Sequence, residues 1–372
     1  MNILHIVGAR PNFMKVAPVM RALNSYKAVK QCLIHTGQHY DDNMSKVFFE
    51  ELELPRPDIN LEVGSDSHAR QTAEVMIRLE PEILERKPEL VLVYGDINST
   101  IAAALVCAKL GVPLGHVEAG LRSFDRSMPE EINRLLTDQV ADFLFTPSLD
   151  GNKNLLREGI SKNKIHFVGN VMIDTLVNLL PKAKKKWEDS NFLSKILRLD
   201  SDIIRNQYGL VTLHRPSNVD ETNVLISIVN TLDDISSSLP LIFPIHPRTC
   251  KQLESQGFKK KNQQLYLVDP LSYLDFLALQ CHAKVVITDS GGIQEETTYL
   301  GIPCLTLRKN TERPITVTKG TNVVIGQDMD RLKREIKKVL NGRIKKGKVP
   351  PLWDGRASER IAQIVFPLNK KF

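Results

Sequence analysis

Three acidic residues in the first half of the chain have the type and placement of acid–base groups. Asp96 and Glu118 each follow an apolar run that predicts a buried strand, and Glu130 follows further along. Carboxylates fixed at strand ends can remove a proton from a bound substrate or return one. Asp96 also suits a turn or a helix cap, and Glu130 forms a capping-box pattern with Ser127, with Pro129 in the first turn. Glu118 is the hardest to explain structurally, because it is the charged end of an apolar strand.

A loop at residues 8–15, Gly-Ala-Arg-Pro-Asn-Phe-Met-Lys, follows the first predicted strand and opens a helix. Its backbone amides, together with Arg10 and Lys15, offer positive charge to an anion at a helix N-terminus. The alternative is a plain strand-to-helix turn with surface cations. Because the glycine spacing is not G-x-G-x-x-G, the loop does not predict a bound NAD.

A second loop, at residues 288–296, lies between an apolar strand and another predicted helix. It offers a hydroxyl and two amides to a diphosphate, from Ser290, Gly291 and Gly292. Glu296 lies in the first turn of that helix, where it would accept hydrogen bonds from ribose hydroxyls or simply pair with the helix dipole. Downstream, Arg313 precedes a proline and offers a guanidinium suited to phosphate.

Two histidines, His214 and His246, end predicted strands in the second half, and their matching positions favour a role at a site. His35 and His39 are four residues apart, but Thr-Gly-Gln between them interrupts the helix that would direct both at one metal ion. We expect neither a metal nor a cofactor. The five cysteines form no C-x-x-C pair, as expected of free thiols in a reducing, cytoplasmic compartment.

Short apolar runs alternate with helical patterns, which is typical of parallel sheets with crossover helices. The first half has predicted strands at 3–7, 31–35, 90–94, 114–117, 143–146 and 165–168. The second half has predicted strands at 209–213, 241–245, 265–268, 285–288, 303–307 and 323–325. A lysine-rich helical stretch at 180–202 lies between the two series. We therefore expect an α/β fold of two Rossmann-like domains facing a cleft, residues 1–172 and 173–356.

Composition and charge limit the partners of the 372-residue chain. Its 50 basic and 43 acidic residues give a net charge of +7, but residues 331–348 hold nine Lys or Arg against one acid. A basic excess confined to one helix and loop is typical of a solvated face. The longest apolar run, 101–108, is less than half a membrane span. We expect neither nucleic-acid nor membrane binding, and the first residues read as a strand and not as a signal peptide.

Seven segments that hold these residues resemble, in the same order, the non-hydrolysing UDP-N-acetylglucosamine 2-epimerase family. They begin at Gly8, Gly95, His116, Met128, His214, Asp289 and Thr311. The resemblance implies a glycosyltransferase-B-like fold, a last helix, 357–372, that returns to the first domain, and a homodimer. It also implies an isomerase that inverts C2 of UDP-N-acetylglucosamine. In that reaction UDP is eliminated and added back through a 2-acetamidoglucal, which supplies precursors for surface polysaccharides.

By the same resemblance, one group of residues contacts the nucleotide: Arg10, Phe276, Ser290, Gly291, Gly292, Glu296 and Arg313. A second group surrounds the sugar and the diphosphate: Lys15, Asp96, Glu118, Glu130 and His214. His246, at its strand end, is a further candidate for UDP binding. Which carboxylate acts as the acid and which as the base stays open.

Two departures from the family pattern bear on regulation and sugar specificity. Many members read His-Arg-Arg-Glu where this chain reads His-Arg-Pro-Ser at residues 214–217, so Pro216 and Ser217 replace an arginine and a glutamate. Leu271 replaces a glutamine. Segments 35–41 and 121–124 also resemble a branch acting on UDP-2,3-diacetamido-glucuronic acid, which is the alternative substrate. A hydrolysing epimerase, a glycosyltransferase of the same fold and a sugar-nucleotide-binding regulator are further alternatives. Three strand-end carboxylates favour elimination over transfer, and a mere binder has no need of them.

Overall fold

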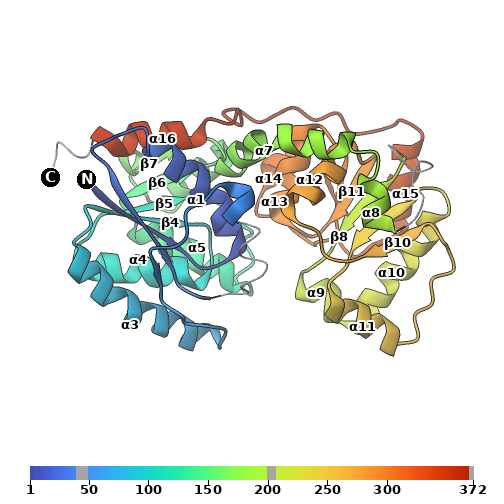
Figure 1. The fold of residues 1–372 in the computed structure, drawn as a ribbon, viewed down its shortest axis with the longest axis horizontal. Coiled ribbons are helices and arrows are strands. Elements are labelled where there is room, and N and C mark those ends of the chain that lie inside the picture. Colours follow the sequence, from blue (N-terminus) through green and yellow to red (C-terminus); the bar gives the residue numbers. More distant parts are fainter. Residues whose placement is uncertain (39–48, 199–206, 368–372) are drawn as a thin grey trace. The chain divides into compact units, whose positions relative to one another are not determined.

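A computed structural model describes residues 1–38, 49–198 and 207–367. The chain divides into two compact units, one made of Met1–Asn178 with Pro351–Phe372 and the other of Leu179–Pro350. Each unit has its own parallel sheet flanked by helices (Figure 1). The two-sheet α/β class expected from the sequence is confirmed. Within the described ranges, no helix is both long and apolar enough to cross a membrane.

The first unit contains a seven-stranded sheet in the order β3-β2-β1-β4-β5-β6-β7. Its strands are β1 (Asn2–Val7), β2 (Lys30–His35), β3 (Ile59–Asn60), β4 (Leu90–Tyr94), β5 (Leu114–Val117), β6 (Phe143–Thr146) and β7 (Ile165–Phe167). All five residues of β4 are buried, because helices cover both faces of the sheet. That burial explains the continuous apolar sequence of the strand.

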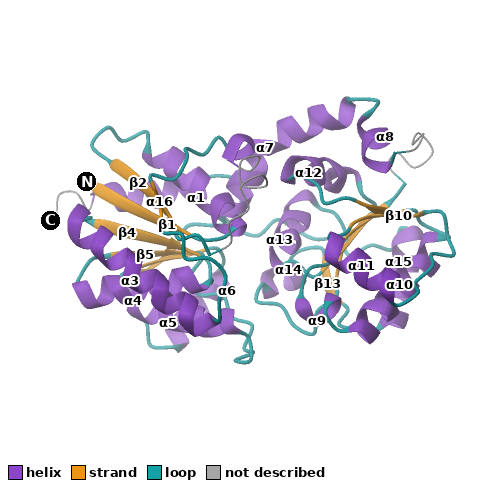
Figure 2. Ribbon diagram, turned by 60° about the horizontal axis from the view of Figure 1, so that its bottom comes forward, coloured by secondary structure: helices purple, strands orange, loops and turns teal. Residues whose placement is uncertain are grey.

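The helices of this unit form a layer on each side of the sheet. They are α1 (Arg10–Leu23), α3 (His68–Arg86), α4 (Asn98–Leu110), α5 (Pro129–Val140), α6 (Leu149–Arg157), the short η1 (Lys162–Lys164), the start of α7 (Val171–Glu188) and α16 (Ala357–Val365). Helices α1 and α16 lie on one face, and α3, α4 and α5 lie on the other (Figure 2). Helix α4 ends at Gly111, whose φ of 69° is the left-handed conformation of a helix C-terminus.

The last helix is part of the first unit through both polar and aromatic contacts. The carboxylate of Asp174 accepts hydrogen bonds from the backbone amides of Ala357 at 3.0 Å and Ser358 at 2.6 Å. These bonds satisfy amides that the start of α16 leaves without helical partners. The rings of Tyr26 and Phe366 stack with their centroids 4.4 Å apart. Residues more than 150 positions apart in the sequence therefore build one core.

The second unit contains a six-stranded sheet in the order β10-β9-β8-β11-β12-β13. Its strands are β8 (Gly209–Thr212), β9 (Leu241–Pro244), β10 (Leu265–Val268), β11 (Val285–Thr288), β12 (Cys304–Thr306) and β13 (Asn322–Val324). Its helices are α8 (Phe192–Leu197), α9 (Pro216–Val219), α10 (Thr222–Ser236), α11 (Pro247–Ser255), α12 (Tyr273–His282), α13 (Gly291–Leu300), α14 (Pro314–Thr318) and α15 (Met329–Leu340). The apolar cluster inside this unit includes Val211, Leu232 and Val285, all fully buried.

The order of strands in each sheet reverses direction at one point. The reversal lies between β1 and β4 in the first sheet and between β8 and β11 in the second. In open parallel sheets a ligand binds beyond the carboxyl ends of the strands at such a point, because the crossover helices there run to opposite sides. The loops after these four strands are the places to look for chemistry.

Two predictions about secondary structure need correction. The strand β3 was missed because its two residues are too short for an apolar pattern. The helix predicted at 180–202 is instead the end of α7 and the separate helix α8. An Asx turn, in which Asp189 accepts from the amide of Asn191 at 2.9 Å, offers the backbone another conformation at the break. Residues 199–202 of that prediction, like His39, lie outside the described ranges.

Candidate active site

Glu118 lies directly after β5 in a backbone conformation that glutamate rarely adopts. Its φ is 76°, in the left-handed region, and the residue is only 6% exposed. The carbonyl of Phe145 accepts hydrogen bonds from the amides of Glu118 at 3.1 Å and Ala119 at 3.0 Å, which fixes this turn. Such backbone strain costs of order 1–3 kcal/mol and persists only where the surroundings enforce it. A strained, buried glutamate directly after a strand is therefore more typical of a functional site than of a hydrophobic core.

The Glu118 carboxylate forms a buried ion pair with Lys15 of α1. Gly95, which follows β4, is next to this pair: a Cβ at that position would lie 2.6 Å from Nζ of Lys15 and 3.2 Å from Oε2 of Glu118. The turn therefore requires glycine. Lys15 thus differs from the surface cation of a plain strand-to-helix turn.

Two backbone amides just before α1 are already hydrogen-bonded within the protein. Oδ1 of Asn12 accepts hydrogen bonds from the amides of Gly8 at 3.1 Å and Ala9 at 3.3 Å. The prediction that the amides of this loop would meet an anion is therefore wrong for these two groups. Arg10, the first residue of α1, is half-buried and remains a candidate for contact with an anion.

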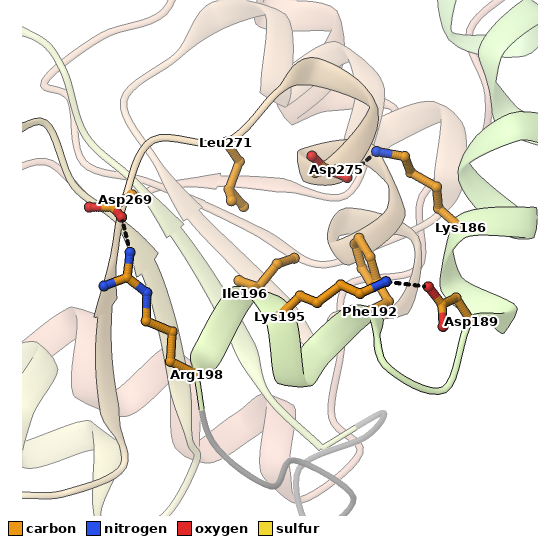
Figure 3. Close-up of a pocket in the computed structure, with 9 residues that line it drawn as sticks. All are labelled: Lys186, Asp189, Phe192, Lys195, Ile196, Arg198, Asp269, Leu271 and Asp275. Atoms are coloured by element: carbon orange, nitrogen blue, oxygen red, sulfur yellow. Dashed lines mark hydrogen bonds and ion pairs between the residues drawn. The ribbon is translucent and has the colours of Figure 1, made fainter.

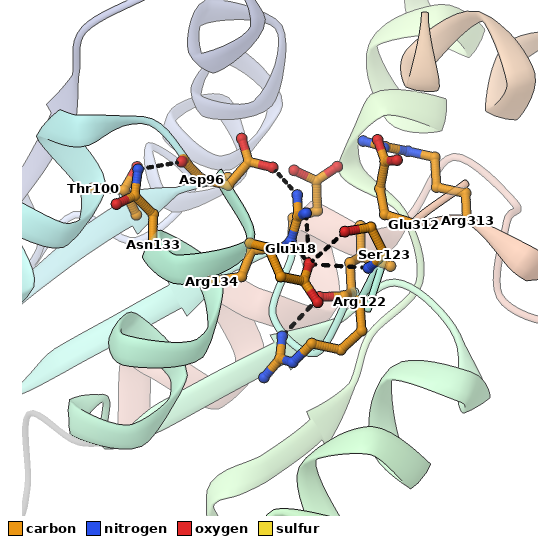
Figure 4. Close-up of polar contacts among 12 residues, drawn as sticks. Asp96, Thr100, Glu118, Arg122, Ser123, Asn133, Arg134, Glu312 and Arg313 are labelled. Carbon is orange, nitrogen blue, oxygen red and sulfur yellow. Dashed lines mark hydrogen bonds and ion pairs between the residues drawn. The ribbon is translucent and has the colours of Figure 1, made fainter. Parts of the chain in front are cut away.

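Asp96 follows Gly95 and is ion-paired with Arg134 of α5, as Figure 4 shows. The Asp96 side chain is 28% exposed, so it is accessible while its partner is buried. The amide of Asn133 donates to the backbone carbonyl of Asp96 at 2.9 Å. Two adjacent residues of α5 therefore hold the turn after β4.

The structure does not form the capping box that rivalled a chemical role for Glu130. The residue that caps α5 is Met128, and the hydroxyl of Ser127 instead donates to Asp125 at 2.5 Å. Glu130 is half-buried in the first turn of α5, so the structural alternative loses its support. The buried carboxylate of this turn belongs to Glu131.

Glu131 accepts hydrogen bonds from the Ser123 amide at 2.9 Å, the Ser123 hydroxyl at 3.0 Å and the Phe124 amide at 2.9 Å. Its carboxylate also pairs with Arg134 at 2.7 Å. Burial alone would raise the pKa of Glu131, but the Ser123 amide and Arg134 outweigh it and hold the pKa below its ordinary value. Glu131 therefore connects the loop 121–127 to the arginine beside Asp96.

In the second unit, His214 follows β8 and Asp289 follows the neighbouring strand β11. Nδ1 of His214 lies 2.9 Å from Oδ1 of Asp289, and the histidine side chain is 57% exposed while the carboxylate is fully buried. His246 has a different environment: it precedes α11, and its ring accepts from the amide of Arg248 at 3.2 Å as a helix cap.

The loop that contains Ser290 is built around Arg313. Ser290 is the cap residue of α13 and makes no capping hydrogen bond with its side chain. A Cβ on Gly291 would clash with Arg313 and would lie 2.7 Å from Oε1 of Glu312. Arg313 forms ion pairs with Glu312 and, at 2.8 Å, with Glu295. Its guanidinium is thus fixed against the start of α13, as phosphate recognition needs.

Glu296 is buried in the second turn of α13, so the prediction that it lies in the first turn is wrong, because the helix begins at Gly291. Tyr273 donates a hydrogen bond to its carboxylate at 3.0 Å. Burial, reinforced by the nearby charge of Glu295, raises the pKa of Glu296 to about 7 despite that hydrogen bond. Phe276 is on the same helix as Tyr273 and is half-buried. A strongly shifted carboxyl group at a strand-order reversal marks a candidate ligand site.

A pocket of about 380 Å³ opens elsewhere in this unit, beside α8 (Figure 3). Its lysines and arginine are paired with carboxylates in the same lining, for example Lys195 with Asp189 at 3.0 Å and Arg198 with Asp269 at 2.6 Å. Leu271 lines this pocket, but none of the predicted catalytic or nucleotide-binding residues does.

Comparison with known proteins agrees with this geometry. The family described as UDP-N-acetylglucosamine 2-epimerase matches residues 21–366 of the chain. The chain belongs to this epimerase family. The UDP-N-acetylglucosamine 2-epimerase of Methanococcus maripaludis is 44% identical over 370 residues, which is 98% of each protein. Family membership makes the protein an isomerase by class and confirms the glycosyltransferase-B-like fold expected from the sequence.

Two further relatives frame the substrate question for this epimerase. The Methanocaldococcus jannaschii enzyme, solved in complex with UDP-GlcNAc and UDP, superposes with a TM-score of 0.88 at 42% identity, covering 99% of this chain and 100% of that one. The UDP-2,3-diacetamido-2,3-dideoxy-D-glucuronate 2-epimerase of Pseudomonas aeruginosa is 40% identical over 372 residues, 99% of this chain and 100% of that protein.

The sequence did not reveal several charged residues that organise this epimerase: Glu131, Arg134, Asp138 and Asp289. The first three are spaced i, i+3 and i+7, so they share one face of α5. That face is buried, and charged residues are almost never fully buried unless paired. This spacing of three charged residues on a predicted helix would have indicated Glu131, Arg134 and Asp138 from the sequence.

Proposed function

We propose that this chain interconverts UDP-N-acetylglucosamine and UDP-N-acetylmannosamine by inverting the configuration at C2. The observation that carries this proposal is the pair of carboxylates, Asp96 and Glu118, after the adjacent strands β4 and β5. Each is held by a buried cation, Arg134 in one case and Lys15 in the other. Positioned carboxylates of this kind are what proton transfer at a sugar carbon requires.

The chemistry follows from the low acidity of the C2 proton. No carbonyl group neighbours C2 in the ring, so direct removal of the proton leaves an unstabilised carbanion. Breaking the C1–O bond to UDP creates positive character at C1, which acidifies the C2 proton. A carboxylate then takes that proton and leaves 2-acetamidoglucal. Return of UDP to C1, with protonation of C2 from the opposite face, gives the epimer.

The first unit supplies the groups for proton transfer in this proposal. Asp96, Glu118 and Glu130 are the candidate acid and base groups. Asp96 is accessible and Glu118 is buried, so the two carboxylates have different surroundings, as two groups with opposite roles need. Arg10 and Lys15 are candidates for contacts with the diphosphate.

The second unit supplies the nucleotide site in this proposal. The start of α13, with Ser290, Gly291 and Gly292, and the fixed guanidinium of Arg313 are suited to the diphosphate of UDP. Glu296 accepts the ribose hydroxyls, and Phe276 contacts the base. His214, oriented by Asp289, stabilises the departing diphosphate, and His246 is a further candidate for UDP binding.

A second candidate substrate is UDP-2,3-diacetamido-glucuronic acid, supported by the 40% identity to the Pseudomonas aeruginosa enzyme named for that sugar. We also propose that the enzyme is a homodimer and acts in the cytoplasm, upstream of polysaccharide synthesis. All five cysteines are free thiols, as a reducing compartment requires.

Incubation of each sugar nucleotide in deuterated water, followed by NMR of C2, tests the proposal. We expect deuterium at C2 and formation of the manno epimer from UDP-N-acetylglucosamine. Faster exchange with the diacetamido substrate would assign the protein to the second candidate. An intact C2 proton in both sugars, with transfer to an acceptor or with hydrolysis alone, would contradict the epimerisation mechanism.

A further inference from the structure

A buried ionic network lies behind the turns that carry Asp96 and Glu118. It consists of His116 on β5, Asp138 on α5 and Arg122, whose side chains are at most 1% exposed. Burying charges is unfavourable unless the partners are well placed. None of these three side chains is among the proposed acid–base groups or nucleotide contacts.

His116 connects the first of these turns to the network. Its Nε2 lies 2.8 Å from the carbonyl oxygen of Gly95, the residue before Asp96. Its Nδ1 lies 2.6 Å from Oδ1 of Asp138. Carbonyl and carboxylate oxygens accept hydrogen bonds, so each ring nitrogen of His116 faces an acceptor. His116 therefore links the turn of Asp96 to Asp138.

Asp138 connects the second turn to the same network. Its Oδ2 accepts from the amide of Gly120, two residues after Glu118, at 3.0 Å and pairs with Arg122 at 2.7 Å. Burial alone would raise the pKa of Asp138, but His116 and Arg122 outweigh it, hold the pKa below its ordinary value and keep the carboxylate ionised. Asp138 therefore holds the turn of Glu118 directly and the turn of Asp96 through His116.

Both turns need such support. The left-handed conformation of Glu118 is strained, and Gly120 approaches Gly151 so closely that a Cβ would lie 2.6 Å from its carbonyl oxygen. Gly95 lies against the Glu118 carboxylate, so a movement of either turn changes the surroundings of both candidate catalytic groups. Proton transfer at the two faces of one carbon loses rate when the groups are misplaced by about 1 Å.

We propose that His116 and Asp138 are positioning residues for the epimerisation, fixing the turns of Asp96 and Glu118 relative to each other. This inference rests on the proposed function. The alternative is an ion pair that serves stability alone. The two explanations predict different results. Misplaced proton-transfer groups lower kcat of the folded enzyme, whereas lost stability lowers the amount of folded enzyme and leaves its kcat unchanged.

The test compares His116→Asn with His116→Gln. The longer amide of glutamine reaches the position of Nε2 and can donate to the Gly95 carbonyl, whereas asparagine reaches only the position of Nδ1. Asn154→Ala is the matched control, because it removes a buried hydrogen bond to the carbonyl of Gly120 at 2.9 Å but leaves the bond from the Gly120 amide to Asp138, which holds the Glu118 turn, intact.

We expect His116→Asn to lower kcat by at least about thirtyfold with KM within about threefold. His116→Gln should regain about tenfold of that loss, and Asn154→Ala should keep kcat within about threefold. Circular dichroism and UDP titration report whether each variant is folded. Equal losses in the two His116 variants, or a loss in Asn154→Ala as large as in His116→Asn, would overturn the proposal.

A measurement on the unaltered enzyme covers the case in which His116→Asn does not fold. NMR of the histidine rings should show a slowly exchanging, hydrogen-bonded proton on Nε2 of His116, because that nitrogen lies 2.8 Å from the carbonyl oxygen of Gly95. Absence of that hydrogen bond would refute the proposed link. If the unaltered enzyme and Asn154→Ala both lack epimerase activity, the proposed function itself is wrong, which is a different outcome from a loss confined to His116→Asn.

Discussion

Nδ1 of His214 lies 2.9 Å from Oδ1 of Asp289, across the neighbouring strands β8 and β11. Asp289 also accepts from the amide of Arg215 at 3.0 Å and from the side chain of Asn218 at 3.0 Å. Burial alone would raise the pKa of Asp289, but His214 and these donors hold it below its ordinary value. A buried carboxylate thus orients an exposed imidazole beside the proposed UDP site.

Asp289→Asn should lower turnover by about tenfold to a hundredfold, because the ring of His214 loses its orienting charge. His214→Asn should cost at least as much, and the double variant should cost no more than His214→Asn alone, since the two residues act as a unit. Steady-state kinetics of the three variants checks this. Additive losses would show that Asp289 acts independently of His214.

Asp96→Asn and Glu118→Gln should each lower turnover by at least about a hundredfold, as expected for the loss of a positioned acid or base. The affinity for UDP should change little, because neither carboxylate belongs to the proposed nucleotide site. Rapid-quench kinetics and calorimetric titration with UDP measure the two quantities. Near-normal turnover in either variant would remove that carboxylate from the mechanism.

Glu130→Gln and Glu131→Gln are a matched pair on consecutive residues of α5. Glu130→Gln should lower turnover by at least about a hundredfold and leave stability within about 0.5 kcal/mol, since no capping box depends on it. Glu131→Gln should lower the free energy of unfolding by about 2 kcal/mol, because its carboxylate is buried and paired. The reverse assignment, found by activity assays and urea unfolding, would transfer the chemical role to Glu131.

Arg313→Ala and Gly292→Val should weaken UDP binding by at least about tenfold. The first removes a cation, and the second blocks the approach of backbone to phosphate. Calorimetry with UDP and, for comparison, with uridine separates the loss of phosphate contacts from general damage. Unchanged UDP affinity in both variants would place the nucleotide elsewhere.

The stability of the second unit should depend on the ionisation of Glu296. Its pKa in the folded state, about 7, is raised above the ordinary value of 4.5, so its stabilising contribution is present at low pH and is lost as pH rises from about 4.5 through about 7. The free energy of unfolding of Glu296→Gln, compared with that of the unaltered protein, should therefore rise by up to about 3 kcal/mol between about pH 5 and about pH 8. Urea unfolding at both pH values measures this, and a constant difference would contradict it.

Much of the fold was predictable because parallel strands buried on both faces leave continuous apolar runs. The strands at 90–94, 114–117, 143–146, 265–268 and 285–288 have the same bounds in the sequence prediction and the structure. Helix ends were less predictable, since local hydrogen bonds decide them. The Asx turn at Asp189 and the cap of α5 at Met128 are contacts that no periodicity reveals.

The positions of Asp96, Glu118 and Ser290 just after strands were predictable, because the apolar runs before them mark those strands. The residues that hold those groups were not, because their partners are distant in sequence: Asp96 pairs with Arg134, and Lys15 pairs with Glu118. A single sequence contains the residues of such pairs without showing which ones meet. The strained φ of Glu118 is likewise a property of the folded turn and leaves no trace in composition.

The cap that Asp174 provides for α16 has a consequence for biosynthesis. The amides of Ala357 and Ser358 that it binds are synthesised more than 180 residues later. The second unit, Leu179–Pro350, is continuous in sequence and can complete its sheet while the ribosome is still translating the last segment. The first unit begins folding earlier and finishes later. A nascent chain stalled before residue 351 would leave the surface of α1 that α16 covers exposed to solvent.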